Sequence, residues 1–466
     1  MASPRTGPLL IIVVTTCLVA VAFALGTRQS PGRSHPPVID NSTSSAMPED
    51  NPTLPTNDRP DNLSSTEPVG AEQPIRVAAI ATTYFPNSHA DVIVGKFLRG
   101  FPTDDGLLAP RTKVVSLYLD QVHHEDIGLQ VAHKFNVPVY ESIRGALTLG
   151  GSDLAVDAVL LIGEHGNYPR NELGQKKYPR YELFKKITDV FRVDGRSVPV
   201  FNDKHLSWKW EWAREMVDIS RELDFPFMAG SSLPVTWRMP AVDLPRGRKV
   251  NELIGLAYGG VDSYDFHALE TMQCMAERRD DGESGVEWVE GLRGDAFWKA
   301  MSKGSFDAGG WSPELFEACL TRTQTLGQPR STFTHWHPTA KQIREMVKEP
   351  VAYRYQHRDG TRATMLLMNG LVRDFTFAAD LEGRKAPLST LFHLPPTPNV
   401  QYSAELMGHA EDMFVSGKAG YPVERTLLVS GILAASIESM VKQKRLQTPH
   451  LDVKYKSTRK STFARA

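Results

Sequence analysis

The chain has 466 residues, more than a single hydrophobic core normally supports, so we predict two domains with appended segments. Its formal net charge is -1 and 41% of its residues are hydrophobic, as expected for an ordinary globular protein. A nearly neutral chain has no long-range attraction to polyanions, which argues against nucleic acid as a partner.

The N-terminus predicts export. An uncharged run over residues 9–25 follows Arg5 and ends in small residues that suit signal peptidase. Because this run is long for a cleaved segment and short for a spanning helix, residues 1–26 are either a signal peptide or a membrane anchor. Residues 27–74 are rich in Pro, Ser, Thr, Asn and Asp, which predicts a disordered linker. We expect an exported protein, periplasmic or extracytoplasmic, either free or anchored in the membrane through residues 9–25.

From Arg76 onward, short apolar runs alternate with amphipathic segments of helix length. Continuous apolar strands separated by helices predict a parallel sheet that is covered on both faces. We therefore predict a Rossmann-like domain over residues 75–235. Its strands are expected at 75–81, 113–120, 137–141, 156–163, 198–201 and 225–232, and its helices at 91–100, 127–135 and 181–191.

Residues 236–453 have a different pattern, and we predict a C-terminal α/β domain with an open, largely antiparallel sheet. A helix is expected to begin near Tyr264, and another is expected from Val423 to Lys444. Turn signals at Asp359-Gly360 and Asn369-Gly370 predict hairpins between alternating runs. We expect a homo-oligomer to assemble through this sheet and a basic, solvated tail over residues 454–466. The runs are 351–357, 362–369, 371–379 and 388–394.

The segment after the first strand, "AAIATTYFPNSHA", bears on a dinucleotide. A Rossmann site needs glycines there, so that backbone amides at a helix N-terminus can approach the pyrophosphate. Ala81, Thr83 and Pro86 stand at those positions, although Thr hydroxyls can also bind phosphate. Asp120 closes the second strand, where an acid would meet a ribose hydroxyl or would cap a helix. The predicted cofactor-binding residues are Ala81, Thr82, Thr83, Asp120, Gly163 and Glu164.

The order of the motifs resembles the Gfo/Idh/MocA oxidoreductases, the family of glucose-fructose oxidoreductase and inositol dehydrogenase, over residues 75 to about 453. "VPVFNDKHLS" is similar to the family strand that ends in Glu-Lys-Pro, with Lys204 on the lysine. "GGVDSYDFHALE" is similar to the Gly-Gly…Asp-x-x-x-His segment, with His267 on the histidine. Asp203 replaces the family glutamate, and the glycine motif is altered, so the chain resembles a divergent member.

This resemblance implies an NAD(P)-binding Rossmann domain and hydride transfer from a hydroxyl of a sugar, polyol or glycoside to NAD or NADP. Lys204 would stabilise the alkoxide, His267 would accept the proton, and Asp203 would complete the catalytic set. Lys204 and His267 should then meet in one cleft at the carboxyl ends of the strands. The structural alternatives are a solvated helix-capping lysine and a packed histidine. The predicted substrate residues are His165, His205, Asp262 and Asp265.

Two other functions remain open at this stage. The chain could be a carbohydrate-binding pseudoenzyme without cofactor, in which Tyr84 and Phe85 fill the phosphate site. If the site is retained, a helix N-terminus near Ser88 and His89 should offer amides to a pyrophosphate. The second alternative is a metal-dependent lyase or hydrolase that uses the loop of Glu164 and His165. No close ligand spacing supports a metal, and we predict no metal ligands.

Overall fold

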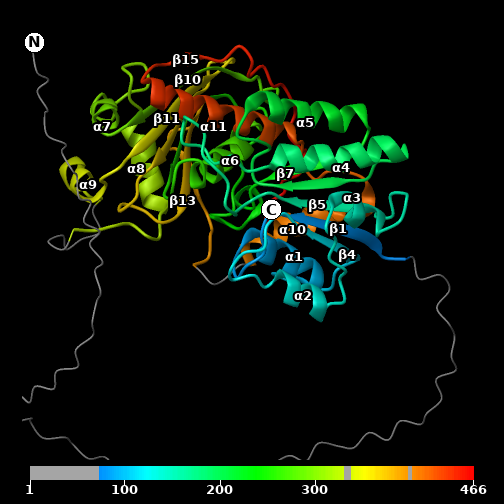
Figure 1. Cartoon of the computed structure of the whole chain (residues 1–466). Helices are drawn as coiled ribbons and strands as arrows, with labels where there is room; N and C mark the ends of the chain where they lie inside the picture. Colours follow the sequence, from blue (N-terminus) through cyan, green and yellow to red (C-terminus); the bar gives the residue numbers. More distant parts are fainter. Residues whose placement is uncertain (1–72, 330–336, 397–400, 466) are drawn as a thin grey trace, which may run out of the picture. The chain divides into compact units, whose positions relative to one another are not determined.

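A five-stranded parallel sheet carries the first part of the described chain, in the order β4-β1-β5-β6-β7 (Figure 1). The computed structural model describes residues 73–329, 337–396 and 401–465. Strands β5, β6 and β7 are buried throughout because helices cover both faces of the sheet, and β5 and β7 are apolar runs, whereas β6 ends in Asn202 and Asp203. The strand order reverses at β1, which opens a crevice at the carboxyl edge of the sheet. The strands are β1 (Ile75–Ala81), β4 (Thr112–Leu119), β5 (Ala158–Ile162), β6 (Val200–Asp203) and β7 (Phe227–Gly230).

Helices pack on both faces of this sheet (Figure 1). One face contacts α1, α2 and, from much later in the chain, α10, while the other contacts α3, α4 and α5. A small hairpin, β2-β3, follows α1 and packs against α10. These elements are α1 (His89–Arg99), β2 (Phe101–Thr103), β3 (Gly106–Leu108), α2 (Gly128–Lys134), α3 (Ile143–Thr148), α4 (Arg180–Asp194), α5 (Trp210–Glu222) and α10 (Ala404–Ser416).

One predicted strand of this part, at residues 137–141, is wrong. Val139 forms an isolated bridge with Leu117, and no named strand includes it in the described chain. The reason is local, because Ser142 caps α3 immediately afterwards and turns the chain into a helix. The other strands and the helices predicted for this part are confirmed to within a few residues.

An eight-stranded sheet carries the second part of the described chain, in the order β15-β10-β11-β12-β9-β13-β14-β8. Its neighbouring strands are antiparallel except for β9 and β12, which are parallel. The predicted fold class, α/β with a parallel sheet and a largely antiparallel one, is therefore confirmed. The strands are β8 (Arg238–Met239), β9 (Val250–Ala257), β10 (Val286–Arg293), β11 (Val351–His357), β12 (Arg362–Leu367), β13 (Phe375–Leu381), β14 (Leu388–Phe392) and β15 (Leu446–Gln447).

Strand β9 lies between β12 and β13, which the sequence did not predict. The hairpin at Asp359-Gly360 is confirmed, since β11 and β12 pair directly. The hairpin predicted at Asn369-Gly370 is wrong, because the chain crosses over β9 there and β13 pairs with β9 instead of β12. Seven of the eight residues of β9 are buried, so it lacks the alternation of apolar and polar residues that marks a half-exposed strand.

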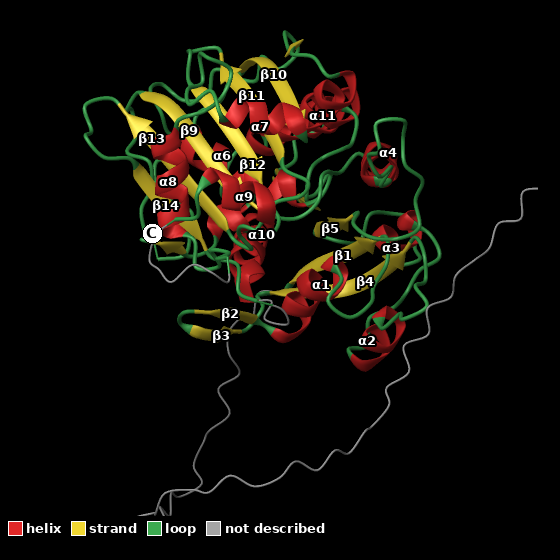
Figure 2. Cartoon of the chain, turned by 90° about the vertical axis from the view of Figure 1, so that its left-hand side faces the viewer, coloured by secondary structure: helices red, strands yellow, loops and turns green. Residues whose placement is uncertain are grey.

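Both faces of the second sheet are covered by helices of the same chain (Figure 2). Helices α6 and α11 cover one face, and α7, α8 and α9 cover the other, where Ile254, Leu256 and Ala378 are at most 1% exposed. The face on which a homo-oligomer was expected is thus already buried, and that prediction has no support from this surface. The helices are α6 (Tyr264–Ala276), α7 (Asp295–Met301), α8 (Pro313–Arg322), α9 (Ala340–Met346) and α11 (Glu424–Lys442).

The described residues belong to one compact unit, which includes the C-terminal tail. The basic side chains of the tail are exposed as expected, but Phe463 and Ala464 are buried, and the Ala464 amide donates to the Val235 carbonyl at 2.9 Å. None of the helices described is long and apolar enough to cross a membrane. The predicted signal or anchor segment and nearly all of the predicted linker, residues 1–72, lie outside the described residues.

Candidate active site

A cavity of about 670 Å³ opens at the carboxyl ends of β5, β6 and β7. Glu164, Lys204 and Ser231, which follow strands β5, β6 and β7, contribute to its lining, and the second part of the chain contributes Tyr258 and His267. Lys204 and His267 therefore line one cavity, as the predicted shared cleft requires. We call this space the first cavity.

Lys204 is held in an unusual backbone conformation directly after β6. Its φ of 69° is left-handed, and its amide donates to the Gly230 carbonyl at 3.1 Å. Its Nζ lies 3.9 Å from Glu164 Oε1 and 3.5 Å from the Ser263 carbonyl oxygen. His165, which also lines the first cavity, has a φ of 69° too. A non-glycine residue with a left-handed φ is strained and persists only where the surrounding structure stabilises it. Such residues are frequent at functional sites.

His267 lies in the first turn of α6 and faces the same cavity. Its Nδ1 and the Ser231 hydroxyl share a hydrogen bond of 2.6 Å. Burial and the nearby Lys204 ammonium hold the pKa of His267 well below 6.5. The imidazole is therefore neutral at neutral pH and can accept a proton. Ser231, which fixes this ring, was not among the predicted site residues, although it lies within the strand predicted at 225–232 and directly follows β7.

A buried ion pair lies behind the wall of the first cavity. Arg180, 0% exposed, bonds to the Glu164 carboxylate, and its Nη1 donates to His205 Nε2 at 3.1 Å. Burial alone would raise the pKa of Glu164, but Lys204 and Arg180 outweigh it and hold that pKa below its usual range. Gly163 makes room for this pair, since a Cβ there would lie 2.4 Å from Arg180 Cγ.

Of the predicted substrate residues, His165 lines the first cavity and His205 does not. His205 is 3% exposed and lies against Arg180, where burial and the guanidinium keep its pKa well below 6.5. His165 is also shifted, because burial and the neighbouring His89 lower its pKa to about 4. His205 thus supports the wall, whereas His165 can meet a ligand as a neutral imidazole.

Asp262 and Asp265, the two predicted substrate acids that precede His267, do not line the first cavity. Asp265 is 0% exposed and accepts the amides of Asp262, Ser263 and Phe266 together with the Tyr353 hydroxyl. Its carboxylate therefore holds the N-terminus of α6, and it does not line the first cavity. Asp262 lines a different cavity, on the other side of the same loop.

Asp203 forms a pair that sequence reasoning missed. Its Oδ2 lies 2.6 Å from His89 Nδ1, and both residues line the first cavity. His89 comes from the start of α1, 114 positions earlier in the chain, so only folding reveals the pair. A carboxylate that orients an imidazole is a common arrangement for acid–base chemistry, and this pair faces the same cavity as Lys204.

The residues predicted to hold a cofactor lie beside the first cavity, and most of them do not line it. Ala81, Thr82 and Thr83 are buried, and the Thr82 hydroxyl donates to the Glu164 carbonyl at 2.6 Å. Asp120 accepts the Tyr118 hydroxyl at 3.1 Å and the Tyr168 hydroxyl at 2.6 Å. Of the six predicted residues, Glu164 lines the first cavity.

Side chains occupy the space over the carboxyl end of β1. Tyr84 is 1% exposed and packs against Gly128, where a Cβ would lie 2.7 Å from Tyr84 Cβ. The ring of Phe85 stacks on His123 at 4.3 Å between centroids and meets His165 at 5.2 Å. These contacts bridge the loops after β1, β4 and β5, which is the filled arrangement expected if phosphate binding has been lost.

The N-terminus of α1 is occupied by the chain itself. The Ser88 hydroxyl accepts the Asp91 amide at 3.3 Å, and Asp91 Oδ2 accepts the Asn87 amide at 2.9 Å. The Asp91 carboxylate thus takes a place that suits an anion. One group is free for a phosphate, because the Thr83 hydroxyl is buried without a hydrogen-bond partner among the described residues.

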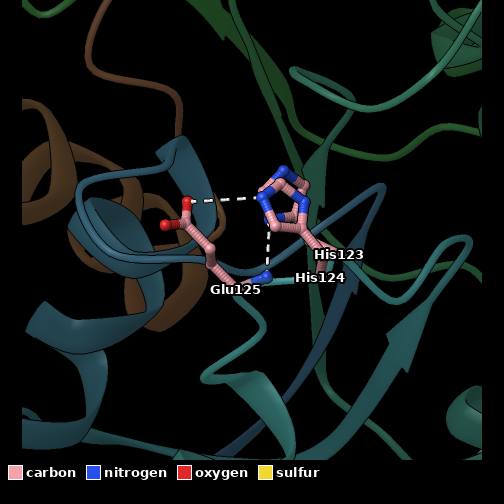
Figure 3. A group of neighbouring side chains, drawn as sticks. All are labelled: His123, His124 and Glu125. Atoms are coloured by element: carbon pink, nitrogen blue, oxygen red, sulfur yellow. Dashed lines mark hydrogen bonds and ion pairs between the residues drawn. The ribbon is translucent and has the colours of Figure 1, made fainter. Parts of the chain in front are cut away.

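Within the described residues, one group brings three possible metal-ligand atoms within 4.8 Å of one another, namely His123, His124 and Glu125 (Figure 3). These residues are consecutive and mostly exposed, and His123 Nδ1 accepts the Glu125 amide at 3.1 Å. The group lies outside the first cavity. It therefore lends nothing to the predicted metal alternative, which relied on Glu164 and His165.

No family model and no curated protein sequence matches the chain. Among solved structures, it is similar to the myo-inositol 2-dehydrogenase from Lactobacillus plantarum, with 10% identity, a TM-score of 0.46, and coverage of 80% of this chain and 99% of that chain. It is also similar to a myo-inositol dehydrogenase from Lactobacillus casei in complex with NAD(H) and myo-inositol. The identity is 11%, the TM-score is 0.48, and the match covers 80% of this chain and 97% of that chain. A myo-inositol dehydrogenase from Corynebacterium glutamicum is 12% identical, with a TM-score of 0.46 and coverage of 80% of this chain and 99% of that chain. At these identities the function has to be argued from the residues of the site.

Proposed function

We propose that the chain is an oxidoreductase that oxidises a hydroxyl group of a small sugar or polyol, with NAD or NADP as hydride acceptor. The observation that carries this proposal is that Lys204 and His267, from two different parts of the fold, line one cavity. An ammonium group and a neutral imidazole are the two groups that alcohol oxidation needs beside the reacting hydroxyl. The motif resemblance to the Gfo/Idh/MocA oxidoreductases supports the same reading. Export, suggested by residues 1–26, remains part of the proposal.

In this proposal the substrate hydroxyl lies between Lys204 and His267. His267 takes the hydroxyl proton while Lys204 stabilises the negative charge that develops on the oxygen, and a carbonyl forms. Ser231 holds the imidazole in place through its 2.6 Å hydrogen bond. A nicotinamide, when bound, would accept the hydride from the carbon. Tyr258, Tyr264 and Phe375 also line the cavity and would pack against the faces of a sugar ring.

A dinucleotide fits this edge of the sheet only in part. The first cavity has room beside Glu164 and His165, and the Thr83 hydroxyl could donate to a phosphate oxygen. The Asp91 amide of α1, however, already donates to the Ser88 hydroxyl, and the Asp91 carboxylate accepts the Asn87 amide just before the helix, so a pyrophosphate has to displace that carboxylate. We therefore assign the nucleotide no step beyond accepting the hydride.

The second candidate is a carbohydrate-binding protein without cofactor. The specific observation in its favour is the stacking of Phe85 on His123, together with the Asp91 carboxylate at the phosphate position. A metal-dependent lyase or hydrolase has less support, because Arg180 and Lys204 already neutralise the Glu164 carboxylate and compete with a metal for its oxygens.

Titration of the purified full chain with NAD and NADP separates the two candidates. We expect calorimetry to detect binding of at least one dinucleotide. Asp91→Asn should tighten it about two- to fivefold, because removing a charge beside a helix N-terminus changes anion binding by about 0.3–1 kcal/mol. Lys134→Met, on the exposed end of α2, is the control. If neither dinucleotide binds and none co-purifies, the oxidoreductase proposal fails and the binder remains.

The pH profile tests the role of His267. Because burial holds the pKa of His267 well below 6.5, the acidic limb of kcat/KM should lie well below pH 6.5. We expect activity at pH 6 to stay within about twofold of its value at pH 7, measured with a panel of inositols and aldoses. An acidic limb above pH 6.5 would contradict His267 as the base.

A further inference from the structure

A second cavity of about 730 Å³ lies on the far side of the loop that carries Asp262 and Ser263. Ser263 lines the first cavity and Asp262 lines the second, and no lining residue is common to both. The loop of residues 170–175, the end of β10, the start of β11 and the end of α11 form the other walls. The second cavity is therefore a separate site, and the proposed oxidation does not use it.

Asp262 is a buried acid whose hydrogen bonding is incomplete. It is 9% exposed, and its backbone is left-handed, with a φ of 61°. Its Oδ2 accepts the Lys176 amide at 2.6 Å, whereas its Oδ1 is buried with no hydrogen-bond partner in the described chain. Burial and the adjacent Asp265 raise the pKa of Asp262 to about 7. A buried polar atom without a partner is costly, so a donor from a ligand would stabilise this arrangement.

Two cations stand at the rim of the second cavity with no ion pair. The side chains of Arg293 and Lys348 are exposed and make no hydrogen bond or ion pair with the described residues. Glu349 is the nearby acid of the rim. The floor is apolar, formed in part by Val261 and Met440. The cavity thus combines a buried acceptor, an apolar floor and a cationic rim.

We propose that the second cavity binds a small hydroxylated organic anion, a sugar acid or a sugar phosphate. A ligand hydroxyl donates to Asp262 Oδ1, and the anionic group lies against Arg293 and Lys348. Carboxylate and phosphate share the chemistry that this rim recognises, since both accept hydrogen bonds from guanidinium and ammonium groups. A neutral sugar offers the hydroxyl without the anion and should bind more weakly.

The test is calorimetric titration of the full chain with D-gluconate, D-glucose 6-phosphate and neutral D-glucose. Asp262→Asn keeps an acceptor for the Lys176 amide but replaces Oδ1 by a donor. We expect it to weaken binding of the anionic probes about tenfold or more, the loss of one hydrogen bond to a charged group. Arg293→Met combined with Lys348→Met should have an effect of similar size. This double variant changes only exposed side chains and should fold normally.

The matched control is Lys113→Met combined with Lys341→Met, which removes two exposed cations that line neither cavity. It should bind the anionic probes as the unchanged chain does, and so should Lys204→Met, which disables the first cavity. Binding of gluconate alone assigns a sugar acid, and binding of glucose 6-phosphate alone assigns a sugar phosphate. The proposal is overturned if neither anionic probe binds. It is also overturned if the probes bind and neither Asp262→Asn nor the double variant of Arg293 and Lys348 weakens their binding.

Discussion

Lys204→Met is expected to lower kcat/KM roughly 10²- to 10⁴-fold, the range for loss of one group that acts on the reacting proton or oxygen. Lys204 is 3% exposed and borders the first cavity, so no solvent cation can replace it beside the developing alkoxide. Methionine has nearly the same length and fills the same space. Glu164 remains paired with Arg180 in the variant, so the fold should be retained.

The control for this variant is Lys209→Met. Lys209 lies nearby in the chain but is exposed and contacts the Trp212 ring. We expect its activity to stay within about twofold of that of the unchanged chain, since surface substitutions away from a site change little. Circular dichroism and the urea midpoint should match in all three proteins. If Lys204→Met turns over at the normal rate, Lys204 is structural and the mechanism is wrong.

Arg180→Met should reduce the free energy of unfolding by about 3–5 kcal/mol, the cost of leaving a buried carboxylate without its partner. Glu164 is 7% exposed, and in this variant its remaining cation is Lys204, with Nζ at 3.9 Å. Urea denaturation measures the loss. The double variant Arg180→Met with Glu164→Gln should recover most of it, because the uncompensated charge is then gone.

The pH dependence of stability tests the same ion pair. The pKa of Glu164 in the folded chain lies below its ordinary value of 4.5. The ion pair therefore contributes stability that is fully present above pH 4.5 and is lost as the pH falls below it. Arg180→Met should reduce this acid-induced loss.

The matched control is Arg192→Met on the same helix. Arg192 pairs with Glu222, whose side chain is 59% exposed, so this change should cost less than about 1 kcal/mol. Equal losses in the two variants would contradict the buried ion pair as a stabilising feature.

The alternation of short apolar runs with amphipathic segments was enough to predict the parallel sheet and the approximate ends of its strands. Strands such as β5 are buried on both faces, and such strands must be uninterrupted apolar runs, which is a property of the sequence itself. The same pattern failed for β9. Asn251 and Glu252 interrupt its apolar residues. Its place between β12 and β13 follows from pairing over long sequence distances, which no local window records.

For the site, the sequence by itself determined that Lys204 follows the end of a buried strand, and the motif resemblance linked it to His267. Only the tertiary structure decided which groups surround them. Arg180 against Glu164 and His89 against Asp203 are pairs of residues from different elements, and their contacts arise only when the elements pack. Asp262 likewise looked equivalent to Asp265 in the sequence. In the fold, Asp262 lines a second cavity and Asp265 accepts amides at the N-terminus of α6, because each contacts elements that only packing brings beside it.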